Sequence, residues 1–250
     1  MSRFVVVIPA RYASQRLPGK PLRELAGKPM LQHVHERAGE SDASRVVIAT
    51  DDRRIAEVAR GFDAEVCMTS DRHTSGTERL AEVCEKLAWD GGQVVVNLQG
   101  DEPLMPATLI NECAALLSEP DTEMATLASA IESEEDFQNP NVVKVITGAD
   151  DNALYFSRAA IPYSRSGDTD DLALVTALHH HGIYAYRVDV LMGLTQAEPV
   201  ALEKCEQLEQ LRALSLGIQI RVGRPALRPG PGVDTEEDLR VAERLLIDAI

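Results

Sequence analysis

Short apolar runs alternate along the chain with segments that have helical periodicity. The early runs, at residues 4–8 and 46–50, are apolar at almost every position, which is typical of parallel strands buried on both faces. Strands are predicted at residues 4–8, 46–50, 65–68, 94–99, 124–131, 142–147, 153–157, 183–188 and 218–222. Helices are predicted at residues 29–39, 52–62, 77–89, 106–117, 202–216 and 235–250. This alternation predicts an α/β fold with a doubly wound, mostly parallel sheet of the Rossmann-like type.

Local signals at the predicted helix starts support these boundaries. Ser75-Gly-Thr-Glu78 has the form of a capping box, and proline stands at the start of two helices, at Pro29 and Pro106. After about residue 120 the strands become shorter and helices fewer, which predicts a smaller α+β elaboration of the same sheet. We therefore expect one domain over residues 1–250, with a first half at about 1–120 and the elaboration at about 121–250. Residues 164–171 are polar and are predicted to form a loop.

Length and composition narrow the class of protein. The 250 residues are 44% hydrophobic, which is ordinary for a globular protein with a buried core. No stretch approaches the roughly 20 apolar residues of a membrane span, and the first strand is too short for a signal segment, so a cytoplasmic location is expected. The net charge of −15 disfavours broad binding to nucleic acid.

Positive charge is concentrated at the start of this acidic chain. The first 30 residues contain six Lys or Arg and a single acid, a charge of +5, which leaves −20 for the other 220. Such a segment could neutralise a small polyanion, although a solvated basic loop would give the same count. It contains Pro9-Ala-Arg-Tyr-Ala-Ser-Gln-Arg-Leu-Pro-Gly-Lys-Pro21, directly after the first strand, where ligands bind in open α/β sheets. Backbone N–H groups with Arg11, Arg16 and Lys20 could bind phosphates there.

Other phosphate-binding motifs are missing from the sequence. Neither G-x-x-x-x-G-K-[ST] nor G-x-G-x-x-G occurs, which weakens the kinase and dehydrogenase interpretations. Asp101 instead follows a run of valines, at the end of a predicted strand and opposite the basic loop, a suitable place for Mg²⁺. The alternative is that Asp101 caps the helix that starts near Pro106. From the residues, Asp234 reads as an N-cap of the helix predicted at 235–250, and Thr235 is the other candidate for that cap.

These motifs together resemble one enzyme family. Residues 7–22 are similar to the start of the 3-deoxy-manno-octulosonate (Kdo) cytidylyltransferases, and more distantly to the cytidylyltransferases for sialic acid. The resemblance continues over nearly the whole chain, at residues 49–52, 75–80, 97–103, 153–158, 182–187, 208–212 and 232–235. It implies a nucleotidyltransferase-like fold and the reaction of CTP with Kdo to give CMP-Kdo and diphosphate, for lipopolysaccharide biosynthesis. It also implies Mg²⁺ as the cofactor and a homodimer, with the elaboration serving sugar binding and dimerisation.

The resemblance assigns roles to individual residues. It implies catalytic roles for Arg11, Lys20 and Asp101, and metal binding by Asp101 and Asp234. The residues implied to bind the nucleotide are Ala10, Arg11, Ser14, Arg16, Lys20, Ser75, Gly76, Gln99 and Gly100. Those implied to bind the sugar acid are Arg79, Gln99, Arg158, His180, Tyr184, Glu209 and Gln210. From the residues alone, a helix cap at Ser75, packing at Tyr184 and a solvated surface at Glu209 and Gln210 remain open alternatives.

The run His179-His180-His181 looks like a metal site, but neighbouring residues on a strand point to opposite faces, so three in a row cannot converge on one ion. The family pattern matches His180 to the sugar-binding histidine. His179 stands where arginine is often found and His181 where an apolar residue is usual, so which ring enters the pocket stays open.

Other functions are less well supported by the sequence. A cytidylyltransferase for sialic acid or for an amino-substituted Kdo stays possible, because details of the sugar pocket decide the substrate. A catalytically silent nucleotide sensor would not require both carboxylates. A metal-dependent glycosyltransferase would be expected to have an Asp-x-Asp motif, and the strand end reads Gly100-Asp-Glu102 instead.

Overall fold

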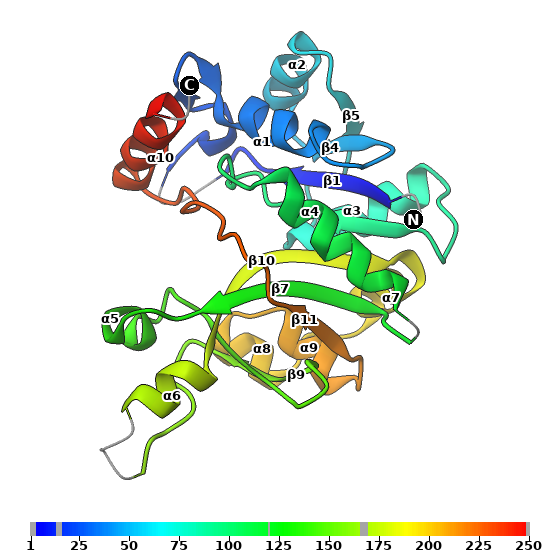
Figure 1. Ribbon diagram of the computed structural model, residues 1–250. Coiled ribbons are helices and arrows are strands. Elements are labelled where there is room, and N and C mark those ends of the chain that lie inside the picture. The colour runs from blue at the N-terminus through cyan, green and yellow to red at the C-terminus, as the bar shows by residue number, and fades with distance from the viewer. Residues whose placement is uncertain (1–3, 14–16, 120, 166–169, 249–250) are drawn as a thin grey trace.

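A computed structural model describes residues 4–13, 17–119, 121–165 and 170–248, and confirms the α/β fold (Figure 1). In the described residues, nine strands form one sheet. Its main path runs in the order β11-β7-β10-β6-β1-β4-β5, and β8 and β9 extend it from β10. The strands are β1 (Phe4–Ala10), β4 (Val46–Thr50), β5 (Glu65–Met68), β6 (Val94–Asn97), β7 (Met124–Ala130), β8 (Lys144–Thr147), β9 (Ala153–Ser157), β10 (Leu178–Arg187) and β11 (Ile220–Gly223). A separate small sheet pairs β2 (Glu24–Leu25) with β3 (Lys28–Pro29).

The direction of the strands changes between the two halves of the chain. Strands β1, β4, β5 and β6 pair in parallel, so their carboxyl ends share one edge of the sheet. Strand β10 then lies antiparallel between β6 and β7, and β11 pairs in parallel with β7. The elaboration predicted after residue 120 thus extends the same sheet.

Ten α-helices occur in the described residues. They are α1 (Met30–Gly39), α2 (Arg53–Gly61), α3 (Gly76–Lys86), α4 (Ala107–Ala115), α5 (Glu134–Gln138), α6 (Asp170–Thr176), α7 (Val188–Gln196), α8 (Ala201–Glu206), α9 (Gln210–Ser215) and α10 (Glu236–Asp248). Short 3₁₀ turns lie at Lys20–Leu22 and Leu116–Ser118. No helix of the described part is both long and apolar enough to cross a membrane.

The helices cover both faces of the sheet because strand residues alternate in direction. In β1, Val5 and Val7 join the core beneath α3, α7 and α9, whereas Val6 and Ile8 join the core beneath α1, α2 and α4. Each of these four side chains is at most 4% exposed. A strand buried on both faces needs an unbroken apolar run, which is why this part of the sequence predicted its strands so closely.

Three parts of the prediction are wrong. The helix expected over 202–216 is two helices, because Gln207 takes a left-handed conformation (φ 53°) and ends α8. The strand expected at 183–188 already begins at Leu178, where three histidines and Gly182, with φ 70°, hide the apolar alternation. Part of the loop expected at 164–171 is helical, since α6 begins at Asp170.

A segment that we call the C-terminal strap, residues 224–234, connects β11 with α10 (Figure 1). It crosses from the far edge of the sheet to the first half of the chain, where the backbone N–H of Val233 donates to the carbonyl of Asp101 at 2.9 Å. Helix α10 then packs against Leu17, Leu25 and Met30. The strap thereby brings Asp234 beside the loops that follow β1 and β6.

Candidate active site

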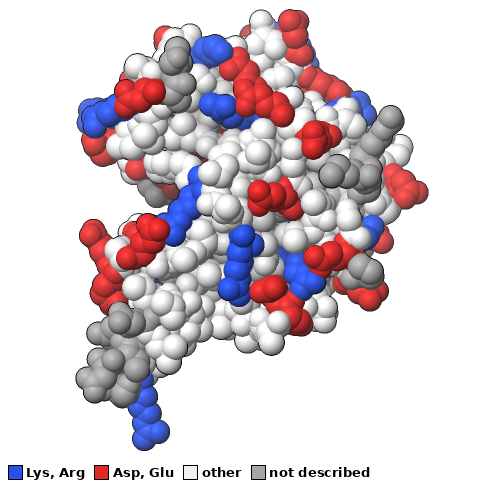
Figure 2. Space-filling view, in the orientation of Figure 1, with Lys and Arg blue, Asp and Glu red and all other residues white. Residues whose placement is uncertain are grey.

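Two adjoining cavities open where the loops after β1 and β6 meet the C-terminal strap. We call the smaller one, of about 480 Å³, the loop cavity, and the larger one, of about 700 Å³, the histidine cavity. Figure 2 shows the molecule hollowed between the part that carries α10 and the part that carries α5, with acidic and basic side chains interspersed over this face. Gln99, Gly76, Asp101 and Asp234 line both cavities.

The loop cavity contains most of the residues predicted to bind the nucleotide. Its described lining consists of Pro9, Ala10, Arg11, Ala13, Lys20, Pro21, Gly76, Gln99, Gly100, Asp101 and Asp234. Ser75 is not in that lining, and its hydroxyl accepts from the backbone N–H of Glu78 in the predicted capping box. Ser14 and Arg16 lie outside the described residues. Six of the nine predicted nucleotide residues therefore line one cavity.

Glycine is required at position 100 because two backbones approach closely there. A Cβ atom on Gly100 would lie 2.8 Å from the carbonyl oxygen of Pro9, a distance that a real side chain cannot tolerate without moving the backbone. The close approach of Gly100 to Pro9 brings the segment after β6 against the end of β1, and both residues line the loop cavity. The family motif around residue 100 thus has a local physical reason.

Lys20 lies between the two carboxylates predicted to bind metal. Its Nζ donates to Asp101 Oδ2 at 2.6 Å, to Asp234 Oδ1 at 2.8 Å and to the carbonyl of Val233 at 2.8 Å. Burial lowers the pKa of the Lys20 ammonium, but the two carboxylates outweigh it, so the pKa is raised above 10.5. The group therefore stays cationic at neutral pH.

The surroundings of this ammonium suit a metal ion. Three oxygen atoms, from two carboxylates and a carbonyl, converge on one cationic position, and oxygen is the donor that Mg²⁺ prefers. The described residues contain no cluster of three or more His, Cys, Asp or Glu side chains able to hold a metal by themselves. The protein would thus supply part of a coordination shell, which substrate oxygens and water would complete.

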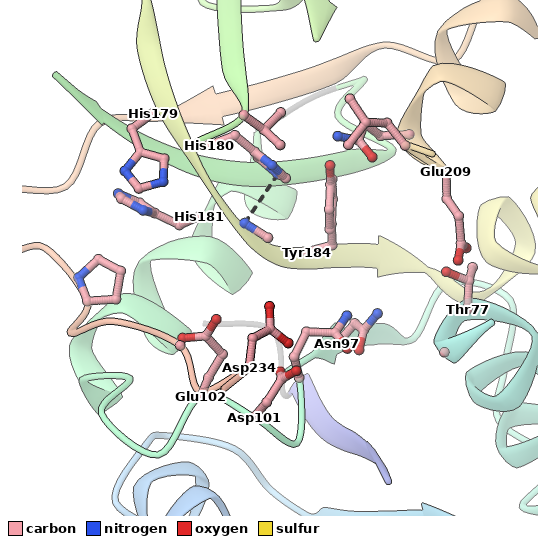
Figure 3. Close-up of a pocket in the computed structure, with 18 of the residues that line it drawn as sticks. Thr77, Asn97, Asp101, Glu102, His179, His180, His181, Tyr184, Glu209 and Asp234 are labelled. Atoms are coloured by element: carbon pink, nitrogen blue, oxygen red, sulfur yellow. Dashed lines mark hydrogen bonds between the residues drawn. The ribbon is translucent and has the colours of Figure 1, made fainter. Parts of the chain in front are cut away.

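A residue other than Asp234 caps α10. The hydroxyl of Thr235 accepts from the N–H of Asp238, while the Asp238 carboxylate accepts from the N–H of Thr235. Of the two caps considered from the sequence, the structure uses Thr235. The Asp234 carboxylate instead points toward Asp101 and Glu102 (Figure 3).

Glu102 is a third acid at this place, and no role was predicted for it. Burial raises the pKa of Glu102 to about 8, and the carboxylates of Asp101 and Asp234 act in the same direction against Lys20. Glu102 is therefore mainly protonated at neutral pH, which limits the negative charge crowded beside Lys20. Its position directly after Asp101 was the signal that could have identified it.

The histidine cavity brings together most of the residues predicted to bind the sugar. Gln99, His180, Tyr184, Glu209 and Gln210 all line it. Figure 3 shows the histidines facing Asp101, Glu102 and Asp234, with Glu209 near Thr77. Glu209 and Gln210 thus face a cavity, and Gln210 is only 6% exposed, so the solvated-surface alternative does not hold for it.

The three histidines divide between two environments. The ring of His180 packs 5.1 Å from Phe156 and 5.2 Å from Tyr184, and its Nε2 lies 3.1 Å from the hydroxyl of Thr126. The rings of His179 and His181 lie together instead, 5.0 Å apart. Burial lowers the pKa of His180 to about 3, so this ring is neutral at physiological pH.

Two predicted sugar-binding residues lie elsewhere in the described structure. Arg79 is fully buried, with Nη1 bonded to Thr69 and 3.3 Å from Asp51. Arg158 donates from Nε to the carbonyl of Glu206 at 2.8 Å. Neither residue is in the lining of either cavity.

All three histidines line the histidine cavity, and so do two residues that the sequence analysis missed, Asn97 and Arg228. Asn97 is the last residue of β6, so its position at a strand's carboxyl end was a usable signal. Arg228 belongs to the C-terminal strap, which has no periodicity from which a direction could be inferred.

Comparison with known proteins now defines the class. A family model described as cytidylyltransferase matches residues 5–220. A cytidylyltransferase from Leptospira borgpetersenii shares the fold, with a TM-score of 0.64 at 16% identity over 99% of this chain and 88% of that one. With the family model matching most of its length, the chain belongs to the cytidylyltransferase family.

More similar proteins narrow the group. The 3-deoxy-manno-octulosonate cytidylyltransferase of Histophilus somni strain 2336 is 52% identical, over 97% of this chain and 98% of its own. The protein of the same name from Aliivibrio salmonicida strain LFI1238 is 51% identical with the same coverage. A structure of CMP:2-keto-3-deoxy-manno-octonic acid synthetase complexed with CTP has a TM-score of 0.91 and 41% identity, each chain being fully covered. The resemblance inferred from the sequence is thereby confirmed.

Proposed function

We propose that this protein activates Kdo by transferring CMP from CTP, with release of diphosphate. The observation that carries the proposal is the junction of the two cavities, where Lys20, Asp101 and Asp234 meet. Relatives at 51–52% identity bear the name of this activity. We place the nucleotide in the loop cavity and the sugar acid in the histidine cavity, so that the reacting atoms lie at the junction.

The reaction joins the two substrates at phosphorus. The anomeric hydroxyl of Kdo attacks the α-phosphorus of CTP in line, loses its proton, and the bond from this phosphorus to the bridging oxygen of diphosphate breaks. Arg11 and Lys20 neutralise the charge that develops on the leaving diphosphate, together with the backbone of the loop. Positioning and charge stabilisation are sufficient for such a transfer, and a covalent intermediate is unnecessary.

We propose Mg²⁺ as the metal and Asp101 and Asp234 as its protein ligands. When bound there, Mg²⁺ would polarise the phosphate and sugar oxygens and lower the pKa of the attacking hydroxyl. Lys20 would then leave its place between the carboxylates and turn toward the phosphates, which its single flexible side chain permits. Lys20 would thus have two roles, as the counter-charge of the two carboxylates without metal and as a phosphate ligand when the metal is bound.

We propose that the sugar hydroxyls bind to Gln99, His180, Tyr184, Glu209 and Gln210. The amide nitrogen Nε2 of Gln210 is buried and has no hydrogen-bond partner in the described part of the chain, which supports a ligand at this position. His180 is held by Thr126 on one nitrogen and is neutral, so it is oriented in advance for a hydroxyl. Ala10, Gly76 and Gly100 would offer backbone groups to the nucleotide.

We also propose a homodimer and a cytoplasmic enzyme. The segment around α6 projects from the body of the molecule (Figure 1) and exposes apolar side chains, with Tyr163 88%, Leu172 62% and Val175 69% exposed. Such an arm would be covered in a dimer. Light scattering on the purified protein should give twice the 27.3 kDa chain mass, and a monomer would contradict this proposal.

The test of the reaction is diphosphate release from CTP in the presence of Mg²⁺. Release with Kdo is expected. Release with another sugar acid and none with Kdo would show that the substrate is wrong, and no release with any sugar acid would contradict the enzymatic function.

A further inference from the structure

The histidine cavity has a sharply unequal charge distribution. Its described lining contains four carboxyl groups, those of Asp101, Glu209, Asp234 and the mainly protonated Glu102, and a single guanidinium, that of Arg228. A sugar acid carries a carboxylate that must find a cationic partner or donors in this cavity. Arg79 and Arg158, which the family resemblance implied to bind the sugar acid, contact other parts of the protein.

We propose that Arg228 binds the carboxylate of the sugar acid and so makes the enzyme specific for acids over neutral sugars. This inference rests on the proposed function, because it concerns the second substrate of that reaction. Arg228 would be a specificity residue on the C-terminal strap, the same segment that carries Asp234.

The contacts of Arg228 leave part of its guanidinium available. Nη2 donates to the carbonyl of Ala130 at 2.8 Å and lies 2.9 Å from Glu132 Oε1. Nε and Nη1 make no hydrogen bond with the described residues. The side chain is 41% exposed and Glu132 is 74% exposed, so this pair is a weak surface contact that a buried ligand can replace. The planar guanidinium can then donate to both oxygens of a carboxylate.

His181 lines the same cavity as Arg228 and is close enough for the guanidinium to influence its pKa. Nε2 of His181 is buried and has no hydrogen-bond partner among the described residues. Burial, followed by the neighbouring His179 and Arg228, lowers the pKa of His181 to about 3, so the ring is neutral and does not compete for the negative charge. A neutral imidazole next to a guanidinium can bind one carboxylate oxygen or an adjacent hydroxyl.

The chemistry of the sugar agrees with this orientation. The carboxylate carbon is bonded to the anomeric carbon, so the acid group must lie close to the reacting hydroxyl at Asp101 and Asp234. In Figure 3 the pair His179 and His181 faces Glu102 and Asp234, while Glu209 lies at the other end of the cavity. The acid group therefore belongs at the end with Arg228, and the hydroxylated tail at the end with Glu209.

The test compares two non-reacting ligands, the 2-deoxy analogue of Kdo and its C1 carboxamide, which lack the attacking hydroxyl. Calorimetry with CTP and Mg²⁺ present should show that the wild-type protein binds the acid at least about tenfold more tightly than the amide. In Arg228→Gln this preference should fall to about twofold or less, since the charge that distinguishes the ligands is gone. Steady-state assays should show a higher KM for Kdo and an unchanged KM for CTP.

The matched control is Glu132→Gln, which removes the present partner of Arg228. It should keep or increase the preference for the acid, because it removes a competing carboxylate. The proposal is overturned if Arg228→Gln keeps the wild-type preference, or if both variants weaken acid and amide equally, as a purely structural role for the Arg228–Glu132 pair would require.

Failure of the proposed function would look different. If the wild-type protein releases diphosphate with another sugar acid and not with Kdo, only the proposed substrate is wrong. The role of Arg228 is then tested with the acid and the amide of that other sugar, and it is again supported if Arg228→Gln loses the preference for the acid and overturned if the variant keeps it. If no sugar acid supports release, the proposed reaction and the role of Arg228 fall together.

Discussion

Replacing Lys20 with Met removes the ammonium group that lies between Asp101 and Asp234. Lys20 is 13% exposed, while the two acids are 34% and 49% exposed, so the lost hydrogen bonds are partly screened by water. We expect a loss of about 2 kcal/mol in the free energy of unfolding without added metal, below the cost of breaking a fully buried pair. For a protein of this size that corresponds to a fall of about 4–8 °C in Tm.

Added Mg²⁺ should reverse part of this loss. With Lys20 gone, the cation no longer has to displace an ammonium from the carboxylates, so it should bind the variant more tightly than the wild type. At ten times the dissociation constant, binding adds about 1.4 kcal/mol to stability. The Tm difference between the two proteins should therefore narrow as Mg²⁺ is titrated at constant ionic strength.

Thermal unfolding with and without Mg²⁺ is the assay, and Lys28→Met is the matched control. Lys28 pairs with Glu36 on the surface, where the side chains are 44% and 40% exposed, so its replacement should cost less than about 1 kcal/mol and show no Mg²⁺ dependence. If Lys20→Met is destabilised but Mg²⁺ raises its Tm no more than that of the wild type, Asp101 and Asp234 do not form a cation site.

Three further predictions concern other positions. Asp101→Asn should abolish diphosphate release while circular dichroism stays near that of the wild type and Tm falls no further than in Lys20→Met, and near-normal activity would contradict the metal assignment. Burial raises the pKa of Glu82, but hydrogen bonds led by that from Lys86 outweigh it and lower the pKa from 4.5 to about 2. Glu82→Gln should therefore lower the free energy of unfolding by about 2 kcal/mol at pH 7. The difference in this free energy between variant and wild type should shrink below pH 4.5 and vanish near pH 2, and a difference that stays constant with pH in denaturant titrations would refute this. Gly100→Ala should raise the KM for CTP and lower the free energy of unfolding by about 1–3 kcal/mol, because the new Cβ atom would meet the carbonyl oxygen of Pro9. An unchanged KM would argue against that contact.

The first half of the fold could be predicted closely because its strands are buried on both faces. The strand expected at 46–50 matches β4, and the strand expected at 94–99 begins at the first residue of β6. Burial on both faces gives continuous apolar runs that need no tertiary information. Strand β10 was harder to predict, because three histidines that line the histidine cavity follow its first residue, Leu178, and replace the apolar pattern there.

The candidate site was predictable where a local motif encodes it. The loop after β1 and the end of β6 are each short, continuous segments, and their residues do line one cavity. Arg79 was misleading because its place in a capping-box motif says nothing about the direction of a side chain that ends beside Asp51. Arg228 could not be found, because its position depends on how the C-terminal strap crosses from β11 to α10.

The C-terminal strap also determines when the site can form during synthesis. Every strand in the described part of the sheet ends at or before Gly223, whereas Asp234 is added later and contacts Lys20 across 214 positions. Because the chain is made from its N-terminus, the strands can begin to pair while Asp234 is still missing from the loop cavity. The nascent protein would therefore complete its sheet before its cation site, and a chain that stops short of the strap would lack both Asp234 and the helix that covers Leu17, Leu25 and Met30.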